Sequence, residues 1–144
     1  HDAERAMALE QLLPLVEIPC AAFYSFQVGK NEGDITRLGL DGLIANLGGT
    51  FKDWHDTARA VAAMDLVITV DSGVAHVAGA LGKPVFILIP YANCWRWMLD
   101  RTDTPWYLSA KLFRQFTPGQ WAEPVLDVKR EIEDIISGRR AKAA

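Results

Sequence analysis

The residues of this sequence best suited to chemistry form one short polar cluster: Asp71, Ser72, Gly73 and His76. The cluster follows an apolar, β-branched run, Leu66–Val70, which is typical of a parallel strand buried on both faces. Residues 74–81 are rich in Ala and predict a short helix, whose free N–H groups and partial positive charge suit an anion, phosphate above all. Gly73 would let the backbone approach that anion closely, and Ser72 would add a hydroxyl donor.

Asp71 and His76 extend this hypothesis beyond a simple phosphate site. Asp71 would repel a phosphate at the same point, so we expect it to accept a hydrogen bond from a sugar or ribose hydroxyl, or to cap the helix. His76 lies one turn into the helix and would face the same crevice, donating to a phosphate or a base. A purely structural interpretation stays open, because Ser or Asp before a helix is a common N-cap and Gly73 would then only permit the turn. The spacing matches neither a P-loop nor G-x-G-x-x-G, so NAD binding is not indicated.

Other elements are predicted to build the sheet that positions this cluster. Residues 66–70, 74–81 and 85–89 form a strand–helix–strand unit, punctuated by Gly82 and Pro84. In open α/β sheets, ligands bind where the carboxyl end of a strand meets the N-terminus of the next helix. Further strands are expected at 21–27, 43–47 and 111–115, and further helices at 3–15, from Asp53 or Asp56 to Met64, and at 123–136.

The alternation of strands and helices predicts one α/β domain over residues 1–138, with a mainly parallel sheet flanked by helices. Within the first helix, which Asp2 would cap, Pro14 should cause a kink or an early end. Residues 35–40 fit either a short helix or an irregular link. Gly138 is expected to end the last helix and to leave residues 139–144 as a basic tail.

The connection over residues 91–107 is too long for a routine link and is rich in aromatic residues. Its two aromatic clusters are Trp95-Arg96-Trp97 and Pro105-Trp106-Tyr107. One interpretation makes these rings a wall for a base or a sugar, with Arg96 or Arg101 facing phosphate. The alternative is that the rings pin a long loop to the body of the protein, with Arg96 stacked between the two Trp rings and no ligand bound.

Composition narrows the classes of function. Half of the 144 residues are hydrophobic and 23% are charged, which is ordinary for a globular domain. The net charge of −3 indicates no general attraction to nucleic acid or to anionic membranes. No apolar run approaches the ~20 residues that cross a bilayer. The polar start shows neither a signal peptide nor an initiator Met, so we expect a cytoplasmic fragment of a longer protein.

The cysteines and histidines do not predict a metal or redox site. Cys20 and Cys94 fall at opposite ends of predicted strands, roughly 20 Å apart for strands of about six residues. A disulfide needs Cα atoms within ~7 Å, so we expect two thiols, in keeping with a reducing cytoplasm. His55 is alone and suits a surface or capping role. No cluster has metal-ligand spacing, and the absence of G-x-S-x-G gives no support to nucleophilic hydrolysis.

The stretch Asp65–Val85 resembles the donor-site signature of the heptosyltransferase family, glycosyltransferase family 9. The strings Trp95–Tyr107, Leu112–Gln115 and Tyr24–Gly29 are similar to a bacterial subgroup in which such a domain ends a chain of tetratricopeptide repeats. The resemblance covers nearly the whole chain. It implies the carboxyl-terminal, Rossmann-like half of a GT-B glycosyltransferase, which binds a nucleotide-diphosphate sugar.

The same resemblance implies roles for particular residues. Asp71 would touch the donor sugar or ribose, and His76 would support the same site. Gln27 would line the crevice from the neighbouring strand, and Arg96 would face the diphosphate. The remaining expected donor contacts are N–H groups of Ser72, Gly73 and Val74. Such enzymes need neither a metal nor another cofactor, because the helix dipole and these donors stabilise the leaving diphosphate.

Two parts of the family pattern are absent from this sequence. One is the acceptor half, which usually supplies the catalytic base, so the base is expected outside these residues. The other is the first strand of the carboxyl half, which would come just before His1 and is central in a doubly wound sheet. Its absence predicts a gap, filled by rearrangement, by another chain or by residues outside this sequence. We therefore expect the fragment alone to be inactive.

The leading hypothesis is the donor-binding domain of an inverting, metal-independent glycosyltransferase that uses a nucleotide sugar. The first alternative is a non-catalytic binding module of a tetratricopeptide-repeat protein that keeps the fold. The second is a nucleotide-sugar epimerase, which shares the architecture. Homo-oligomerisation stays open, and exposed Trp residues or an uncovered sheet edge would favour it.

Overall fold

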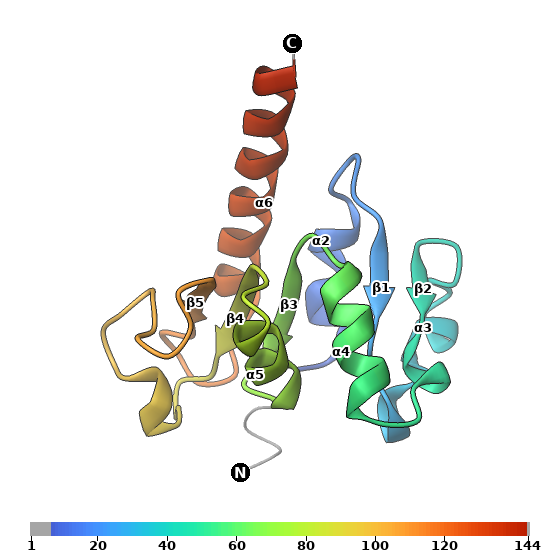
Figure 1. Ribbon diagram of the computed structural model, residues 1–144, viewed down its shortest axis with the longest axis horizontal. Coiled ribbons are helices and arrows are strands. Elements are labelled where there is room, and N and C mark those ends of the chain that lie inside the picture. Colours follow the sequence, from blue (N-terminus) through green and yellow to red (C-terminus); the bar gives the residue numbers. More distant parts are fainter. Residues whose placement is uncertain (1–6, 144) are drawn as a thin grey trace.

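The computed structural model describes residues 7–143, with side chains over residues 7–138, and shows an α/β fold built on parallel strands (Figure 1). The strands are β1 (Phe23–Ser25), β2 (Ile44–Asn46), β3 (Val67–Val70), β4 (Val85–Ile89) and β5 (Ala110–Arg114). The α-helices are α2 (Leu13–Val16), α3 (Asp34–Arg37), α4 (Trp54–Ala63), α5 (Gly73–Ala80) and α6 (Ala122–Ala143). Single 3-10 turns are η1 (Leu9–Leu12), η2 (Gly29–Asn31), η3 (Gly48–Thr50) and η4 (Trp95–Trp97).

The strands form two sheets rather than the single sheet expected from the sequence. β1 pairs with β2, β3 pairs with β4, and β4 pairs with β5, and every pair is parallel. The described residues contain no ladder between β1 and β3, so the sheet is divided at this point. The predicted gap is therefore present, and rearrangement of the described strands has not closed it.

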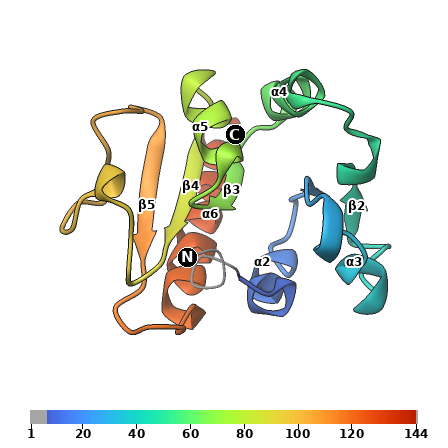
Figure 2. The ribbon, with the colours of Figure 1, turned by 90° about the horizontal axis from the view of Figure 1, so that it is seen from below.

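Two cores lie on opposite faces of β4, because alternate side chains of a strand point to opposite sides. Val85, Ile87 and Ile89 belong to a core that also contains residues of α4 and α5. Phe86 and Leu88 belong to a second core with residues of α2 and α6. All five side chains are at most 6% exposed. Figure 2 shows the same division, with α4 and α5 on one side of the strands and α2, α3 and α6 on the other.

The central strand–helix–strand unit forms as predicted, and local sequence explains its boundaries. The side chain of Asp53 caps α4 by accepting hydrogen bonds from the backbone N–H groups of His55, at 2.8 Å, and Asp56, at 3.0 Å. This geometry selects Asp53 over Asp56 as the first residue of that helix region. α5 ends at Ala80, and Gly82 follows with a φ of 65°, a conformation that glycine adopts without steric penalty.

The first predicted helix is wrong as a continuous element. Its described part is a 3-10 turn, η1, followed by the single turn of α2. Pro14 lies in the first turn of α2, where its missing N–H has no intrahelical partner to lose. The expected start of this helix at residues 3–6 and its cap at Asp2 lie outside the described residues.

Other predicted boundaries also need correction. Gly138 does not end the last helix, because α6 continues to Ala143. An interior glycine costs a helix only about 1 kcal/mol, which the strong helix formers around it offset. Residues 34–37 form the short helix α3, which settles the ambiguity at 35–40. Both cysteines are thiols, as predicted.

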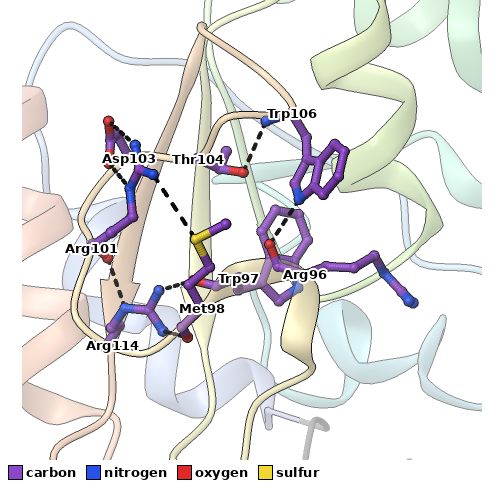
Figure 3. A network of polar contacts seen from close by, with 8 residues as sticks. All are labelled: Arg96, Trp97, Met98, Arg101, Asp103, Thr104, Trp106 and Arg114. Atoms are coloured by element: carbon purple, nitrogen blue, oxygen red, sulfur yellow. Dashed lines mark hydrogen bonds and ion pairs between the residues drawn. The ribbon is translucent and has the colours of Figure 1, made fainter.

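The long aromatic connection is attached to the outer edge of β5 by Arg114 (Figure 3). The Arg114 guanidinium donates to three backbone carbonyls, those of Trp97, Met98 and Arg101. The backbone N–H of Leu112 adds a hydrogen bond to the carbonyl of Thr102, at 2.7 Å. Burial lowers the pKa of Arg114, but a guanidinium is so weak an acid that it keeps its proton in proteins. A cation thus holds the connection in place.

Replacing Arg114 with methionine should free this connection. We expect Arg114→Met to lower the free energy of unfolding by about 1–2 kcal/mol, because several charge-assisted hydrogen bonds are lost together. Chymotrypsin should also cleave the segment at residues 97–104 faster than in the wild type. Arg130→Met is the matched control, because the Arg130 side chain is 70% exposed and pairs only with Asp127 among the described residues. Equal cleavage rates in the wild type and both variants would contradict the role of Arg114.

Candidate functional site

The polar cluster lies where β3 ends and α5 begins. Asp71 is only 5% exposed, whereas Gly73 is exposed as the first residue of α5. Ser72 occupies the N-cap position with extended backbone angles, but its side chain makes no capping hydrogen bond. Its Oγ lies 2.9 Å from the Oγ1 of Thr69 instead. The interpretation of Ser72 as a side-chain cap is therefore wrong, and the first N–H groups of α5 are left without that partner.

Trp54 lies beside this turn, although the sequence analysis did not include it in the site. A Cβ added at Gly73 would come within 2.5 Å of Cη2 of the Trp54 indole. The ring therefore packs against the start of α5, yet it stays 62% exposed. The signal in the sequence is indirect: α4 begins after β2 ends, so its N-terminus falls at the same edge of the strands as the N-terminus of α5.

His76 points toward the aromatic connection. Its Nδ1 lies 2.9 Å from the hydroxyl of Tyr107, and its ring stacks on Trp97 with centroids 5.5 Å apart and an interplanar angle of 18°. Trp97 is 1% exposed and belongs to the core under α4 and α5. The aromatic residues Trp97 and Tyr107 therefore do pin the connection to the body of the protein.

The remaining aromatic residues of the connection face outward. Trp95 is 71% exposed and Trp106 is 54% exposed, and their rings meet edge to face at 6.2 Å. The indole N–H of Trp106 donates to the carbonyl of Arg96, at 3.0 Å, which fixes the ring (Figure 3). Of the aromatic residues of the connection, Trp95 and Trp106 are therefore the two whose rings are exposed enough to form a wall for a ligand.

The two candidate arginines of the connection differ in their partners. Arg101 pairs with Asp103 in a bidentate contact, its Nε and Nη2 donating to the two carboxylate oxygens at 2.7 and 2.8 Å, so its charge is already matched. Arg96 lies over the ring of Trp95, at 5.7 Å, and does not stack between two Trp rings. Figure 3 shows its side chain extending away from the network around Arg114. Arg96 is therefore the better placed of the two to meet an anion.

Gln27 follows the end of β1, in the other sheet from Asp71. Its side chain is exposed, and its Nε2 donates to the neighbouring carbonyl of Val28, at 3.2 Å. A Cβ on Gly48 would collide with the backbone carbonyl of Gln27, so only glycine lets the ends of β1 and β2 approach this closely. The predicted site residues thus follow three parallel strands at one edge of the fold, but Gln27 stands across the division from Asp71.

Two hollows on the surface lie away from the polar cluster. One, of about 530 Å³, lies at the start of α4 and is lined by Lys52, Asp56 and Arg59 among others. The other, of about 600 Å³, lies between residues 99–102, β5 and α6. Neither is lined by Asp71, Ser72 or His76. Within the described part of the chain, no helix is long and apolar enough to span a membrane, and no group of three His, Cys, Asp or Glu residues is placed to hold a metal ion.

The fold is that of a Rossmann-like α/β protein. It has parallel strands in two small sheets, helices on both faces and a polar turn after β3. Residues 40–110 match the family model of glycosyltransferase family 9, described as heptosyltransferase. The match contains β2, α4, β3, α5 and β4, and therefore the cluster at Asp71 as well as Arg96. Gln27 lies outside it.

The chain is also similar to Protein FlbA of Caulobacter vibrioides. The two are 33% identical over 118 residues, which is 78% of this chain and 19% of FlbA. The chain therefore spans about a fifth of the length of the relative it matches. No solved structure matches the chain.

Proposed function

We propose that the chain belongs to glycosyltransferase family 9 and is the donor-binding part of a cytoplasmic, metal-independent glycosyltransferase. Its substrate is a nucleotide-diphosphate sugar. The observation that carries the proposal is the position of the family match, which contains the whole of the β3–α5 turn. Such a turn, at the carboxyl end of a parallel strand, is where α/β proteins bind phosphate groups.

The proposed reaction is a single in-line displacement. An acceptor hydroxyl attacks the anomeric carbon of the sugar, the bond from that carbon to the diphosphate oxygen breaks, and the configuration inverts. Negative charge grows on the leaving diphosphate, where the N–H groups of Gly73 and Val74 and the positive end of α5 stabilise it. The acceptor proton passes to a base outside these residues.

Side chains around the turn supply the remaining recognition. Ser72 carries its hydroxyl at the turn, and Asp71 accepts a hydrogen bond from a sugar or ribose hydroxyl. The exposed face of Trp54 provides a flat apolar wall for the base or the sugar. Arg96 supplies a positive charge for the diphosphate. His76 acts indirectly, because its ring is held between Tyr107 and Trp97.

A non-catalytic binding module, attached to tetratricopeptide repeats, is the second candidate. The exposed pair Trp95 and Trp106 favours it, because large exposed aromatic side chains are typical of interaction surfaces. This candidate keeps the fold but predicts no binding of nucleotide. Nucleotide titration therefore separates the two candidates.

Calorimetric titration of the full-length protein with UDP, ADP and GDP tests the proposed function. We expect saturable binding of at least one nucleoside diphosphate. Ser72→Asp should weaken it by about tenfold or more, because a carboxylate beside the diphosphate repels it. The same Asp is a favourable N-cap, so the melting temperature of the variant should not fall and unfolding cannot explain the loss.

Ser137→Asp is the matched control for this experiment. Ser137 is exposed on α6, whose far end lies opposite the edge that carries the β3–α5 turn (Figure 1). Its substitution adds the same charge and should leave nucleotide affinity unchanged. The proposal would be wrong if no nucleoside diphosphate bound saturably, or if Ser72→Asp and Ser137→Asp had equal effects.

A further inference from the structure

Two exposed Trp side chains of the aromatic connection form a corner on the surface. Trp95 is 71% exposed and Trp106 is 54% exposed, and their rings meet at 86° with centroids 6.2 Å apart. We propose that this pair binds a sugar ring, and that the sugar belongs to the carbohydrate acceptor of the transfer reaction. The acceptor role rests on the proposed function, whereas the binding of a sugar to the pair does not.

Both rings are held in place by the rest of the connection. The indole N–H of Trp106 donates to the carbonyl of Arg96, at 3.0 Å, as Figure 3 shows. The backbone N–H of Trp106 donates to Oγ1 of Thr104, at 3.3 Å, and Thr104 is only 3% exposed. Trp95 belongs to η4, whose last residue, Trp97, is buried in the core. A ligand that binds here therefore has little side-chain ordering to cause, which favours affinity for a small molecule.

The size and shape of the pair suit a sugar better than a protein partner or a base. The two rings together expose roughly 300 Å² or less, whereas each partner of a stable protein interface buries about 800 Å². The C–H groups on one face of a pyranose ring carry partial positive charge, and the face of an indole carries partial negative charge. Two perpendicular rings can contact one face and one edge of the same sugar. A flat base would stack on only one of them.

Arg96 supplies the polar group at the rim of the pair. Its guanidinium carbon lies 5.7 Å from the centroid of the Trp95 ring. Its Nε is buried and has no hydrogen-bond partner among the described residues. Because a buried donor without a partner is costly, this nitrogen marks a place where a ligand oxygen is expected. A sugar hydroxyl or a phosphate oxygen would satisfy it.

The connection carries the pair to the edge of the fold that holds the β3–α5 turn. β4 runs parallel to β3, so the connection after Ile89 starts at this edge. His76 of α5 then contacts Trp97 and Tyr107, which lie close in sequence to the pair. Figure 1 shows η4, in gold, at the same lower edge as the start of α5, and Figure 2 shows α5 between α4 and η4. The pair and Trp54 therefore lie on different sides of α5.

This arrangement assigns the pair to the acceptor rather than to the donor. In the proposed function Arg96 meets the donor diphosphate, so the ring of Trp95 beneath it lies beside the leaving group. An acceptor has to stand there, because its hydroxyl must come within about 3–3.5 Å of the anomeric carbon. Trp54, on the α4 side, is left to the base or sugar of the donor. Donor and acceptor can then be bound at the same time.

Fluorine NMR of the full-length protein labelled with 5-fluorotryptophan tests the sugar site. Replacement of single Trp residues by Phe assigns the resonances. The ligands are cellobiose, maltose and N,N′-diacetylchitobiose, added without nucleotide. We expect at least one of them to shift the resonances of Trp95 and Trp106 saturably. Trp121, which is 4% exposed in the other core, should not shift.

Variants of the pair make the test specific. Trp95→Ala and Trp106→Ala should each weaken saccharide binding by about fivefold or more, because each removes one of the two ring contacts. Trp106→Phe should have a smaller effect, because it keeps a ring but loses the hydrogen bond to Arg96. The matched control is Tyr91→Ala, since Tyr91 is 60% exposed at the start of the same connection. It should leave saccharide affinity unchanged.

Three results would overturn the sugar site. The first is that none of the three saccharides shifts either ring of the pair saturably. The second is that Tyr91→Ala weakens binding as much as Trp95→Ala does. The third is that the resonances of the pair move with protein concentration, because the pair would then pack against a second copy.

Adding UDP, ADP and GDP to the same labelled protein separates this inference from the proposed function. A bound nucleoside diphosphate should shift the resonance of Trp54, and the saccharide should still bind when the nucleotide is saturating. If the two ligands exclude one another, the pair belongs to the donor and the acceptor role is wrong. If no nucleotide binds while a saccharide shifts the pair, the proposed function fails and the sugar site stands.

Discussion

Replacing Trp97 with alanine should lower the free energy of unfolding by about 3–5 kcal/mol, the range expected for removal of a buried Trp. The indole is 1% exposed, lies in the core under α4 and α5, and stacks on His76. Its loss leaves a cavity between α5 and the aromatic connection. Urea denaturation, with the m-value compared between variants, measures the effect.

Trp95→Ala is the matched control, because Trp95 lies two residues earlier in the same turn but is 71% exposed. Its effect should stay below about 1 kcal/mol. Trp97→Phe should fall between the two, because it keeps a ring in the core and removes an indole N–H that is buried without a hydrogen-bond partner among the described residues. Equal losses for Trp95→Ala and Trp97→Ala would mean that the connection is not docked as described.

Replacing Gly79 with alanine should destabilise the protein by about 2 kcal/mol, although glycine to alanine within a helix normally stabilises. A Cβ at this position would lie 2.5 Å from Cδ1 and 2.7 Å from Cδ2 of Tyr107. The ring would have to move away from α5, and its hydrogen bond to His76 would be lost with it. Thermal and urea denaturation measure the change.

Two comparisons make this second prediction specific. Gly138→Ala, also within a helix, should stabilise by about 0.5–1 kcal/mol, because no neighbour among the residues with described side chains lies within 4 Å of the added Cβ. In a Tyr107→Ala background, Gly79→Ala should become neutral or stabilising, since the colliding ring is gone and the two effects are coupled. A loss of the same size in both backgrounds would show that Tyr107 is not the obstacle.

The sequence by itself determined the parts of this protein whose signals are local. The apolar runs of β3 and β4 and the helix between them depend on neighbouring residues, so their positions could be predicted closely. The start of α4 could be narrowed only to Asp53 or Asp56, and the hydrogen bonds of the Asp53 side chain decided between them. The turn at Asp71, Ser72 and Gly73 followed from the same unit. Boundaries that depend on a balance of small energies, such as the end of α6 beyond Gly138, could not be predicted in this way.

Tertiary structure alone decided which side chains are buried and which distant residues they contact. The sequence could not tell that Trp97 is buried while Trp95 is exposed, because both lie in one three-residue turn. It could not turn His76 toward Tyr107, because that contact joins residues 31 positions apart. Trp54 lies beside the site because α4 packs against α5, and the sequence does not show that packing. The division between β1 and β3 likewise depends on which strands pair with one another. The local sequence of β1 and β3 predicts that each is a strand, but it does not say which strand lies beside it.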